Sequence, residues 1–165
     1  MSIFDIFNTR PDVLALKSKG DVDGLIKALN YEKDHNLRIS AAWALGELGD
    51  SSAIEPLINA LDDRKRVKDV VAKALGEIGK PQAIDSLLEL LEDDNWEVRG
   101  TAAKSLGKIG DPQAIEPLIE TLEDKNEIVR WNSSQALENI TGESLGDDAS
   151  KWQAYVTHKK PNKGK

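Results

Sequence analysis

The segment Val98–Asp124, VRGTAAKSLGKIGDPQAIEPLIETLED, contains one complete unit of a repeating pattern. A leucine marks the same place in each repeat, at positions 45, 75, 106 and 137, with intervals of 30 or 31 residues. A period in this range is typical of solenoid proteins, in which a repeat buries its apolar face only by stacking on its neighbours. The spacing therefore predicts a stack of similar units.

Each repeat predicts two helices. In the first helix, apolar or small residues recur at intervals of three and four, which is typical of one buried helix face. In the quoted segment these residues are Val98, Ala102, Ser105, Leu106 and Ile109. Gly110 suits the left-handed cap that ends a helix. Asp111 and Pro112 suit the start of the next helix, since Asp caps free N–H groups and Pro is tolerated in the first turn. No stretch alternates with period two, so we predict no strands.

The pattern from Val98 to Asp124 resembles the short HEAT-like repeat of phycobilisome lyases, and the resemblance extends over about residues 21–142. It implies an all-α fold, a right-handed α-solenoid of stacked antiparallel helix pairs. It also implies that the second helices line the concave surface. A role in attaching or detaching a bilin chromophore is the enzymatic function that this resemblance implies.

The chain of 165 residues fits about one domain, at roughly 150 residues per domain. We expect a single repeat domain over residues 1–158 and a disordered basic tail over 159–165, because the tail is rich in Lys and lacks apolar residues. Within the domain we expect an N-terminal segment (1–11), a divergent first repeat (12–34), regular repeats (35–63, 64–94 and 95–125), and a last first-helix with a C-terminal capping helix (126–158).

The composition excludes several classes of protein. A net charge of −7 argues against a general nucleic-acid binder, which needs a basic surface. The absence of Cys excludes disulfides and thiolate metal ligands, and it is compatible with the cytoplasmic location that we expect. No apolar run approaches the roughly 18 residues of a membrane span. The start, MSIFDIFNTRPD, predicts no signal peptide.

The residues needed for catalysis are scarce. The two histidines are followed by Asn36 and by Lys159, so neither His35 nor His158 matches the His-Glu pairs that hold iron in deoxyhypusine hydroxylase, another protein with HEAT-like repeats. We expect His35 to face solvent near a helix start. The acidic clusters fall where second helices end and favour a role in loops. We therefore predict no enzyme activity, no catalytic or metal-binding residues and no cofactor.

A basic residue follows the valine or leucine that begins each first helix, and its interpretation is open. These residues are Arg38, Lys68, Arg99 and Arg130. They form either ion pairs with Asp residues of an adjoining loop or repeat, or a ladder that binds anions. We favour the ion pairs, because the basic residues recur in register with the core pattern.

Outward positions of the second helices predict a partner surface. They form three rows: Asp23, Glu55, Asp85 and Glu116; Lys27, Asn59, Glu89 and Glu120; Ala28, Ala60, Leu90 and Thr121. The first two rows predict an acidic band for a basic protein segment, and Leu90 is expected to supply an apolar centre. The alternative is an ordinary solvated face. We expect a protein partner and no membrane or specific nucleic acid.

Three large apolar residues, Ile39, Trp43 and Trp131, lie on the outer face of the first helices. One interpretation is that the chain termini cover them, with residues 3–7 over Trp43 and the helix of Trp152 over Trp131. The other is an exposed patch for a partner or a second copy, since Trp is enriched at interface hot spots. The sequence thus favours a non-catalytic scaffold or adaptor that is a monomer or a weak dimer.

Overall fold

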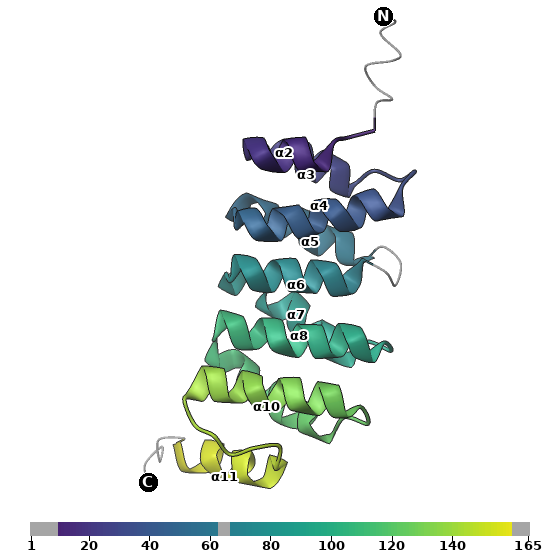
Figure 1. Cartoon of the computed structure of the whole chain (residues 1–165). Coiled ribbons are helices and arrows are strands. Elements are labelled where there is room, and N and C mark those ends of the chain that lie inside the picture. Colours follow the sequence, from purple (N-terminus) through teal and green to yellow (C-terminus); the bar gives the residue numbers. More distant parts are fainter. Residues whose placement is uncertain (1–9, 63–66, 160–165) are drawn as a thin grey trace, which may run out of the picture.

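The computed structural model describes residues 10–62 and 67–159. Within these ranges the chain forms α-helices and short 3-10 turns, and no strand. The helices stack in chain order along one axis, so the first and last helices lie at opposite ends of an elongated molecule (Figure 1). The predicted all-α solenoid is therefore confirmed.

The longer helices form one layer of the stack. They are α4 (His35–Leu48), α6 (Lys68–Ile78), α8 (Trp96–Ile109) and α10 (Glu127–Thr141), and the shorter α2 (Val13–Lys19) precedes them (Figure 1). Asn or Asp side chains cap several of their N-termini, as Asn95 does by accepting a hydrogen bond from Glu97 N at 3.0 Å. Gly110, with φ of 76°, ends α8 in the left-handed conformation predicted for it.

The second helices of the repeats are short and form the other layer. They are α3 (Val22–Leu29), α5 (Ile54–Asn59), α7 (Ile84–Glu89) and α9 (Ile115–Glu120). Single 3-10 turns flank the last three of them. These turns are η1 (Ser51–Ala53), η2 (Ala60–Asp62), η3 (Pro81–Ala83), η4 (Leu90–Glu92), η5 (Pro112–Ala114) and η6 (Thr121–Glu123).

The core lies between the two layers and continues from repeat to repeat. The apolar face predicted for α8 is buried, including Val98, Ala102 and Leu106. Neighbouring first helices approach so closely that a Cβ built on Gly107 would lie 2.6 Å from the Cα of Ala136. Glycine at this position therefore sets the spacing between α8 and α10.

A last helix, α11 (Ala149–Lys159), lies at the C-terminal end of the stack (Figure 1). Trp152 is fully buried there, and its Nε1 donates to the carbonyl of Gly146 at 2.7 Å. The sequence predicts that the disordered tail begins at Lys159. Lys159 is instead the last residue of α11. Residues 1–9 and 160–165 lie outside the described residues. Among the helices described, none has the length and apolar character needed to cross a membrane.

Candidate functional site

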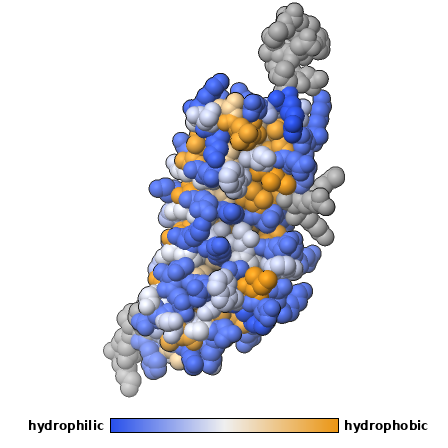
Figure 2. Space-filling model, viewed as in Figure 1, coloured by the Kyte–Doolittle hydropathy of each residue, from blue (hydrophilic) through white to orange (hydrophobic). Residues whose placement is uncertain are grey.

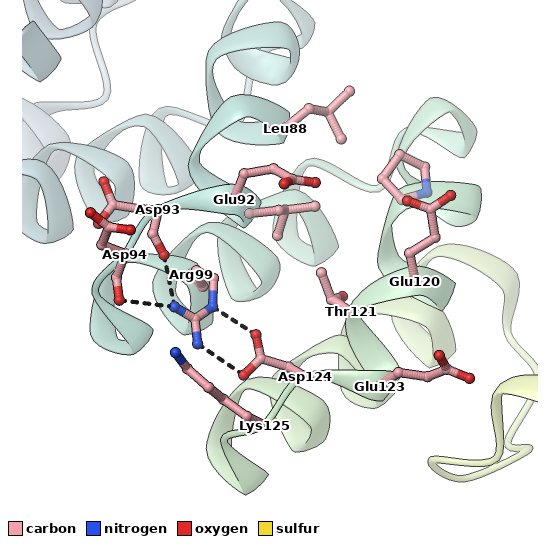
Figure 3. A pocket seen from close by; sticks show the side chains of 12 residues that line it. Leu88, Glu92, Asp93, Asp94, Arg99, Glu120, Thr121, Glu123, Asp124 and Lys125 are labelled. Carbon is pink, nitrogen blue, oxygen red and sulfur yellow. Dashed lines mark hydrogen bonds and ion pairs between the residues drawn. The ribbon is translucent and has the colours of Figure 1, made fainter.

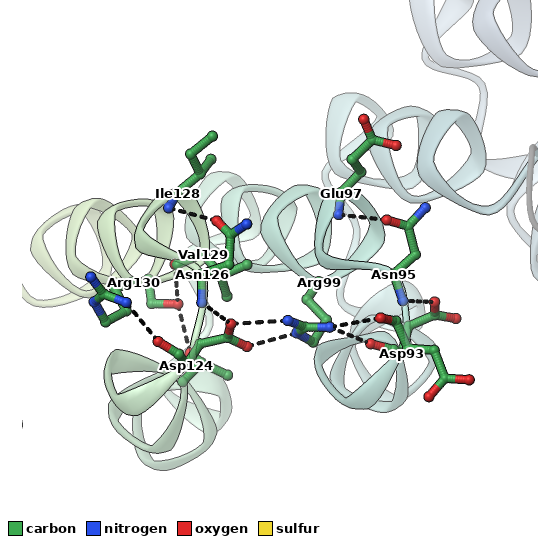
Figure 4. A network of polar contacts seen from close by, with 12 residues as sticks. Asp93, Asn95, Glu97, Arg99, Asp124, Asn126, Ile128, Val129 and Arg130 are labelled. Atoms are coloured by element: carbon green, nitrogen blue, oxygen red, sulfur yellow. Dashed lines mark hydrogen bonds and ion pairs between the residues drawn. The ribbon is translucent and has the colours of Figure 1, made fainter.

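A buried ion pair joins helix α8 to the loop that ends the same repeat. Arg99 of α8 is only 6% exposed, and its Nε and Nη2 donate to the two carboxylate oxygens of Asp124 at 2.6 and 2.9 Å (Figure 4). Its Nη1 donates to the carbonyls of Asp93 at 2.7 Å and Asp94 at 3.2 Å. The hydrogen bonds from Arg99 lower the pKa of Asp124, against the opposing effect of burial. All three guanidinium nitrogens thus donate hydrogen bonds, and they join the loop before α8 to the loop before α10.

Lys68 makes the equivalent contact one repeat earlier, with Nζ donating to Asp93 at 2.8 Å. Burial raises the pKa of Asp93, but hydrogen bonds from Lys68 and from Asn95 N outweigh it, so the pKa is lowered overall. The same carboxylate orders the loop before α8 by accepting from Asn95 N at 2.9 Å. The ion pairs with an Asp of an adjoining loop, favoured from the sequence, are confirmed at Lys68 and Arg99, and each pair lies within one repeat.

The basic residues at the two ends of the array differ. Nη1 of Arg38 donates to the carbonyls of Tyr31 and Glu32, both at 3.3 Å. Nη1 of Arg130 donates to the carbonyl of Asp124 at 2.8 Å. Among the described residues, no carboxylate pairs with Arg130. The repeat that begins with α10 has no regular second helix, so no loop at its end supplies a counterpart of Asp124.

An acidic cavity of about 420 Å³ opens between α7–η4 and α9–η6 (Figure 3). Leu88, Leu91 and Pro117 form its apolar wall. Its acidic side chains are Glu92, Asp93, Asp94, Glu120, Glu123 and Asp124, and Arg99, Thr121 and Lys125 complete the lining. Asp124 pairs with Arg99 and Asp93 pairs with Lys68, and Lys125 also lines the cavity, so its excess negative charge comes from Glu92, Asp94, Glu120 and Glu123.

A second cavity of about 800 Å³ adjoins the first, because Leu88 and Pro117 line both. Its apolar side chains come from α9, α10 and α11, and they are Ile115, Ile140, Tyr155 and Val156. Gln113 and Glu116 are among its polar lining residues. The two cavities form one groove on the second-helix side of the molecule, acidic at one end and largely apolar at the other.

The structure exposes the side chains of the first two predicted rows. These are Asp23, Glu55, Asp85 and Glu116, and Lys27, Asn59, Glu89 and Glu120. Glu120 lines the acidic cavity and Glu116 lines the apolar one. Asp85 accepts a hydrogen bond from Gln113 Nε2 of the next repeat at 3.0 Å. The groove thus includes two of these eight residues, and the remaining six lie outside its lining.

The third row is buried or half-buried, and Thr121 also lines the acidic cavity. Leu90 is only 6% exposed, so the prediction that it supplies an accessible apolar centre is wrong. It begins the 3-10 turn η4, in which residues three apart lie on one side, and it therefore shares the buried side of Leu87. Ala28 is buried, Ala60 is half-buried, and Thr121 donates to the carbonyl of Leu118 at 2.8 Å.

Sequence reasoning missed the residues that shape the groove. Leu88 shares its repeat position with Ile58 and Ile119, a position that predicts a core residue, but it is half-buried and faces the groove. The acidic clusters at Glu92 and Glu123 were assigned to loops only. Their recurrence immediately after each second helix was the signal available in the sequence.

Two exposed tryptophans lie on α4 and α10, at the two ends of the row of long first helices, and a third, Trp96, lies at the start of α8. Trp131 is 63% exposed and Trp43 is 46% exposed, and Ile39 is half-buried. The prediction that the helix of Trp152 covers Trp131 is wrong, because Trp152 is buried in the core instead. Nζ of Lys17 lies 4.5 Å from the ring centroid of Trp43. The predicted cover from residues 3–7 lies outside the described residues.

Apolar surface on the side viewed in Figure 2 is concentrated in the N-terminal half, and hydrophilic residues dominate elsewhere. Within the described residues, no three acidic or His side chains form a group that could hold a metal ion. His35 is half-buried at the start of α4 rather than solvent-facing, and its Nδ1 lies 3.4 Å from Nη2 of Arg38.

Solved structures with similar folds include three helical repeat proteins. The complex of CpcE and CpcF of phycocyanin lyase from a Nostoc species matches 87% of this chain and 59% of that chain, with a TM-score of 0.69 and 26% identity. Human deoxyhypusine hydroxylase in complex with glycerol matches with a TM-score of 0.64 and 25% identity, over 87% of this chain and 48% of that one. This chain therefore spans about half to three-fifths of the length of these two proteins.

Computationally designed armadillo repeat proteins match with a TM-score of 0.62 and 21% identity, over 88% of this chain and 73% of that chain, which shows likeness of fold alone. No curated protein sequence matches the chain. The sequence pattern of HEAT repeats matches residues 22–95 and 84–150, which together make up most of the chain. The chain therefore belongs to the HEAT-repeat family.

Proposed function

We propose that this protein is a non-catalytic interaction module that binds a basic, partly apolar segment of a partner protein in the groove of the second-helix layer. The observation that carries the proposal is the pair of adjoining cavities, one acidic and one largely apolar. A Lys or Arg side chain of the partner enters the acidic cavity, and apolar side chains beside it pack against the other.

The charges around the acidic cavity suit this role. Glu92, Glu120 and Glu123 are exposed, so they attract a cationic segment from solution and select against acidic ones. Arg99 does not attract an acidic ligand to the cavity, because it already binds Asp124 with two hydrogen bonds. The phycocyanin lyase match, a complex of two subunits, gives separate support for a protein partner.

Apolar burial supplies the remaining affinity. Ile115, Tyr155 and Val156 are half-buried and line the larger cavity. Each square ångström of apolar surface removed from water contributes about 25 cal/mol. A partner that offers charge alone leaves this cavity unfilled, so the groove favours segments that combine both features.

The proposal is tested by selecting peptides from a random display library with the immobilised full-length chain. The expected ligands are enriched in Lys or Arg beside apolar residues. A selected peptide, labelled with a fluorophore, is then titrated with the variant Glu92→Lys/Glu120→Lys, which changes two exposed residues of the acidic cavity. Affinity is expected to fall by about tenfold or more, because charge repulsion replaces attraction, and the affinity of the wild-type chain is expected to fall with salt.

The matched control is Glu97→Lys/Glu143→Lys, which changes the net charge equally at exposed positions outside both cavities. It is expected to retain most of the affinity. Equal losses in the two variants would attribute binding to net charge, and selection of peptides without basic residues would refute the proposal.

A second candidate is a lyase-related role, favoured by the match to the phycocyanin lyase complex over 87% of this chain. In that case the apolar cavity beside Tyr155 holds part of a bilin chromophore. Adding a bilin to the purified chain and recording its absorbance tests this candidate. An unchanged spectrum would remove it.

A further inference from the structure

The first-helix layer is open at its C-terminal end. Gly100 and Gly107 of α8 face α10, since a Cβ on either would meet Asn132 or Ala136. One repeat later, the same positions of α10 are occupied by Trp131 and Glu138. No described first helix follows α10, and α11 packs against α9. No described helix therefore covers the side of α10 that corresponds to the internal contact face of α8, and the loop before α11 borders it through Ser144, Gly146 and Asp147.

This uncovered face has a distinct pattern of side chains, which we call the α10 patch: Ile128, Arg130, Trp131, Ser134 and Glu138. They line a cavity of about 620 Å³, together with Glu127, Gln135, Gly146 and Asp147. Trp131 is 63% and Ile128 is 46% exposed. Large apolar side chains on an open helix face are typical of protein interfaces.

The two ends of the patch carry opposite charges. The Arg130 guanidinium lies near the start of α10, since it binds the carbonyl of Asp124, two residues before the capping Asn126. Glu138 lies in the last turn of α10, where Gln135 Nε2 and Ser144 Oγ donate to its carboxylate at 3.0 and 2.7 Å. These hydrogen bonds hold the Glu138 carboxylate in place, and its oxygens can still accept further hydrogen bonds.

We propose that a second copy of this chain docks on the α10 patch. The two α10 helices pack antiparallel about a two-fold axis near Ser134, which is midway between Arg130 and Glu138. Each Arg130 then faces Glu138 of the other copy, and the Trp131 rings lie between these pairs. A two-fold axis brings the start of one helix to the end of the other, so a patch with opposite charges at its ends complements itself. Arg130 forms the carboxylate pair that Arg99 forms within the chain.

Two further features favour a second copy over continuation of the repeat stack. Trp131 and Glu138 replace the glycines that allow α8 and α10 to approach closely, so α10 cannot accept another helix at that spacing. Glu127 and Asp147 also line this cavity. A register that places these carboxylates opposite Glu138 is repulsive, so the Arg130–Glu138 pairing selects one arrangement.

The test is sedimentation equilibrium of the full-length chain over a range of concentrations in low salt. The expected result is a monomer–dimer equilibrium without larger species. Arg130→Glu is expected to weaken dimerisation about 100-fold, because symmetry creates two repulsive pairs of about tenfold each. The double variant Arg130→Glu/Glu138→Arg is expected to restore it, since each Arg then faces a Glu again. Trp131→Ala is expected to weaken it about tenfold or more without affecting the core.

Trp43→Ala, which alters the exposed Trp at the other end of the layer, is the matched control and is expected to leave the dimer unchanged. Circular dichroism verifies that each variant is folded. A chain that stays monomeric at all concentrations would overturn the proposal, as would a dimer unaffected by Arg130→Glu and Trp131→Ala. Growth into larger species would indicate end-to-end stacking and overturn the two-fold arrangement. Failure of the double variant to recover dimerisation would overturn the proposed pairing.

Discussion

At the scale of single residues, the ion pair between Arg99 and Asp124 combines burial with complete hydrogen bonding. The Arg99 side chain is 7% exposed and that of Asp124 is 10% exposed, so neither charge is well solvated. A buried pair contributes little by itself relative to apolar residues, but removing one partner leaves an uncompensated charge. Arg99 and Asp124 are therefore expected to be strongly coupled.

Asp124→Asn is expected to lower the free energy of unfolding by about 3 kcal/mol, because it leaves the Arg99 charge buried without its counterion. The measurement is urea denaturation at neutral pH. The control is Asp94→Asn, which changes an exposed carboxylate on the equivalent loop one repeat earlier and is expected to cost about 0.5 kcal/mol or less. Similar losses in both variants would contradict the argument from burial.

Stability is also expected to fall in acid. The pKa values of Asp93 and Asp124 are lowered in the folded chain relative to the unfolded one. Their contribution is complete above the unfolded pKa, near 3.9, and is lost as the pH falls through the folded pKa. Denaturation at a series of pH values is expected to show a loss of stability below about pH 4. Asp124→Asn is expected to show a shallower loss, and an identical slope would refute this assignment.

At the scale of elements, the spacing of the first helices depends on residues without side chains. A Cβ on Gly107 would lie 2.6 Å from the Cα and 2.7 Å from the Cβ of Ala136, so the backbones of α8 and α10 would have to separate. A Cβ on Gly100 would meet the Asn132 Nδ2 at 3.0 Å, which is the end of a flexible side chain. The two glycines of α8 thus differ in whether a side chain can be added without moving the backbone of α10.

Gly107→Ala is expected to destabilise the chain by about 2 kcal/mol, since overpacking costs about 1–3 kcal/mol and the backbone of α10 cannot yield easily. Gly100→Ala serves as the matched control. It is expected to be neutral or slightly stabilising, because Ala is about 1 kcal/mol better than Gly in a helix and Asn132 can rotate. Thermal unfolding of both variants provides the comparison, and a reversed order would contradict the packing argument.

At the scale of the whole molecule, contacts run mainly between neighbouring repeats, so the ends are its weakest parts. Helix α11 closes the core at the C-terminal end with Trp152, which is fully buried and makes an edge-to-face contact with Tyr155 at 5.9 Å between ring centroids. At the other end, α2 contains no fully buried residue. The closed end therefore depends on one large side chain.

Trp152→Ala is expected to cost about 3–5 kcal/mol, because it leaves a large cavity in the core. The loss is expected to be local in a repeat array, with faster hydrogen exchange in α9 and α10 and little change in α4. Lys151→Ala, at an exposed position of the same helix, controls for helix propensity. Uniform acceleration of exchange along the chain would show that it unfolds as one unit.

The repeat period, the glycine caps and the apolar faces determined the solenoid from the sequence, because helix formation and stacking depend on spacings within about 31 residues. The ion pairs at Lys68 and Arg99 could be predicted from the sequence for the same reason. Tertiary structure decided which outward positions are accessible. Leu90 turns into the core at η4, and the groove joins Leu88 to Tyr155, far apart in sequence. The exposure of a side chain depends on which elements of the neighbouring repeats pack against it. Only the folded stack therefore shows that Arg130 and Trp131 lie on a face of α10 that no described helix covers.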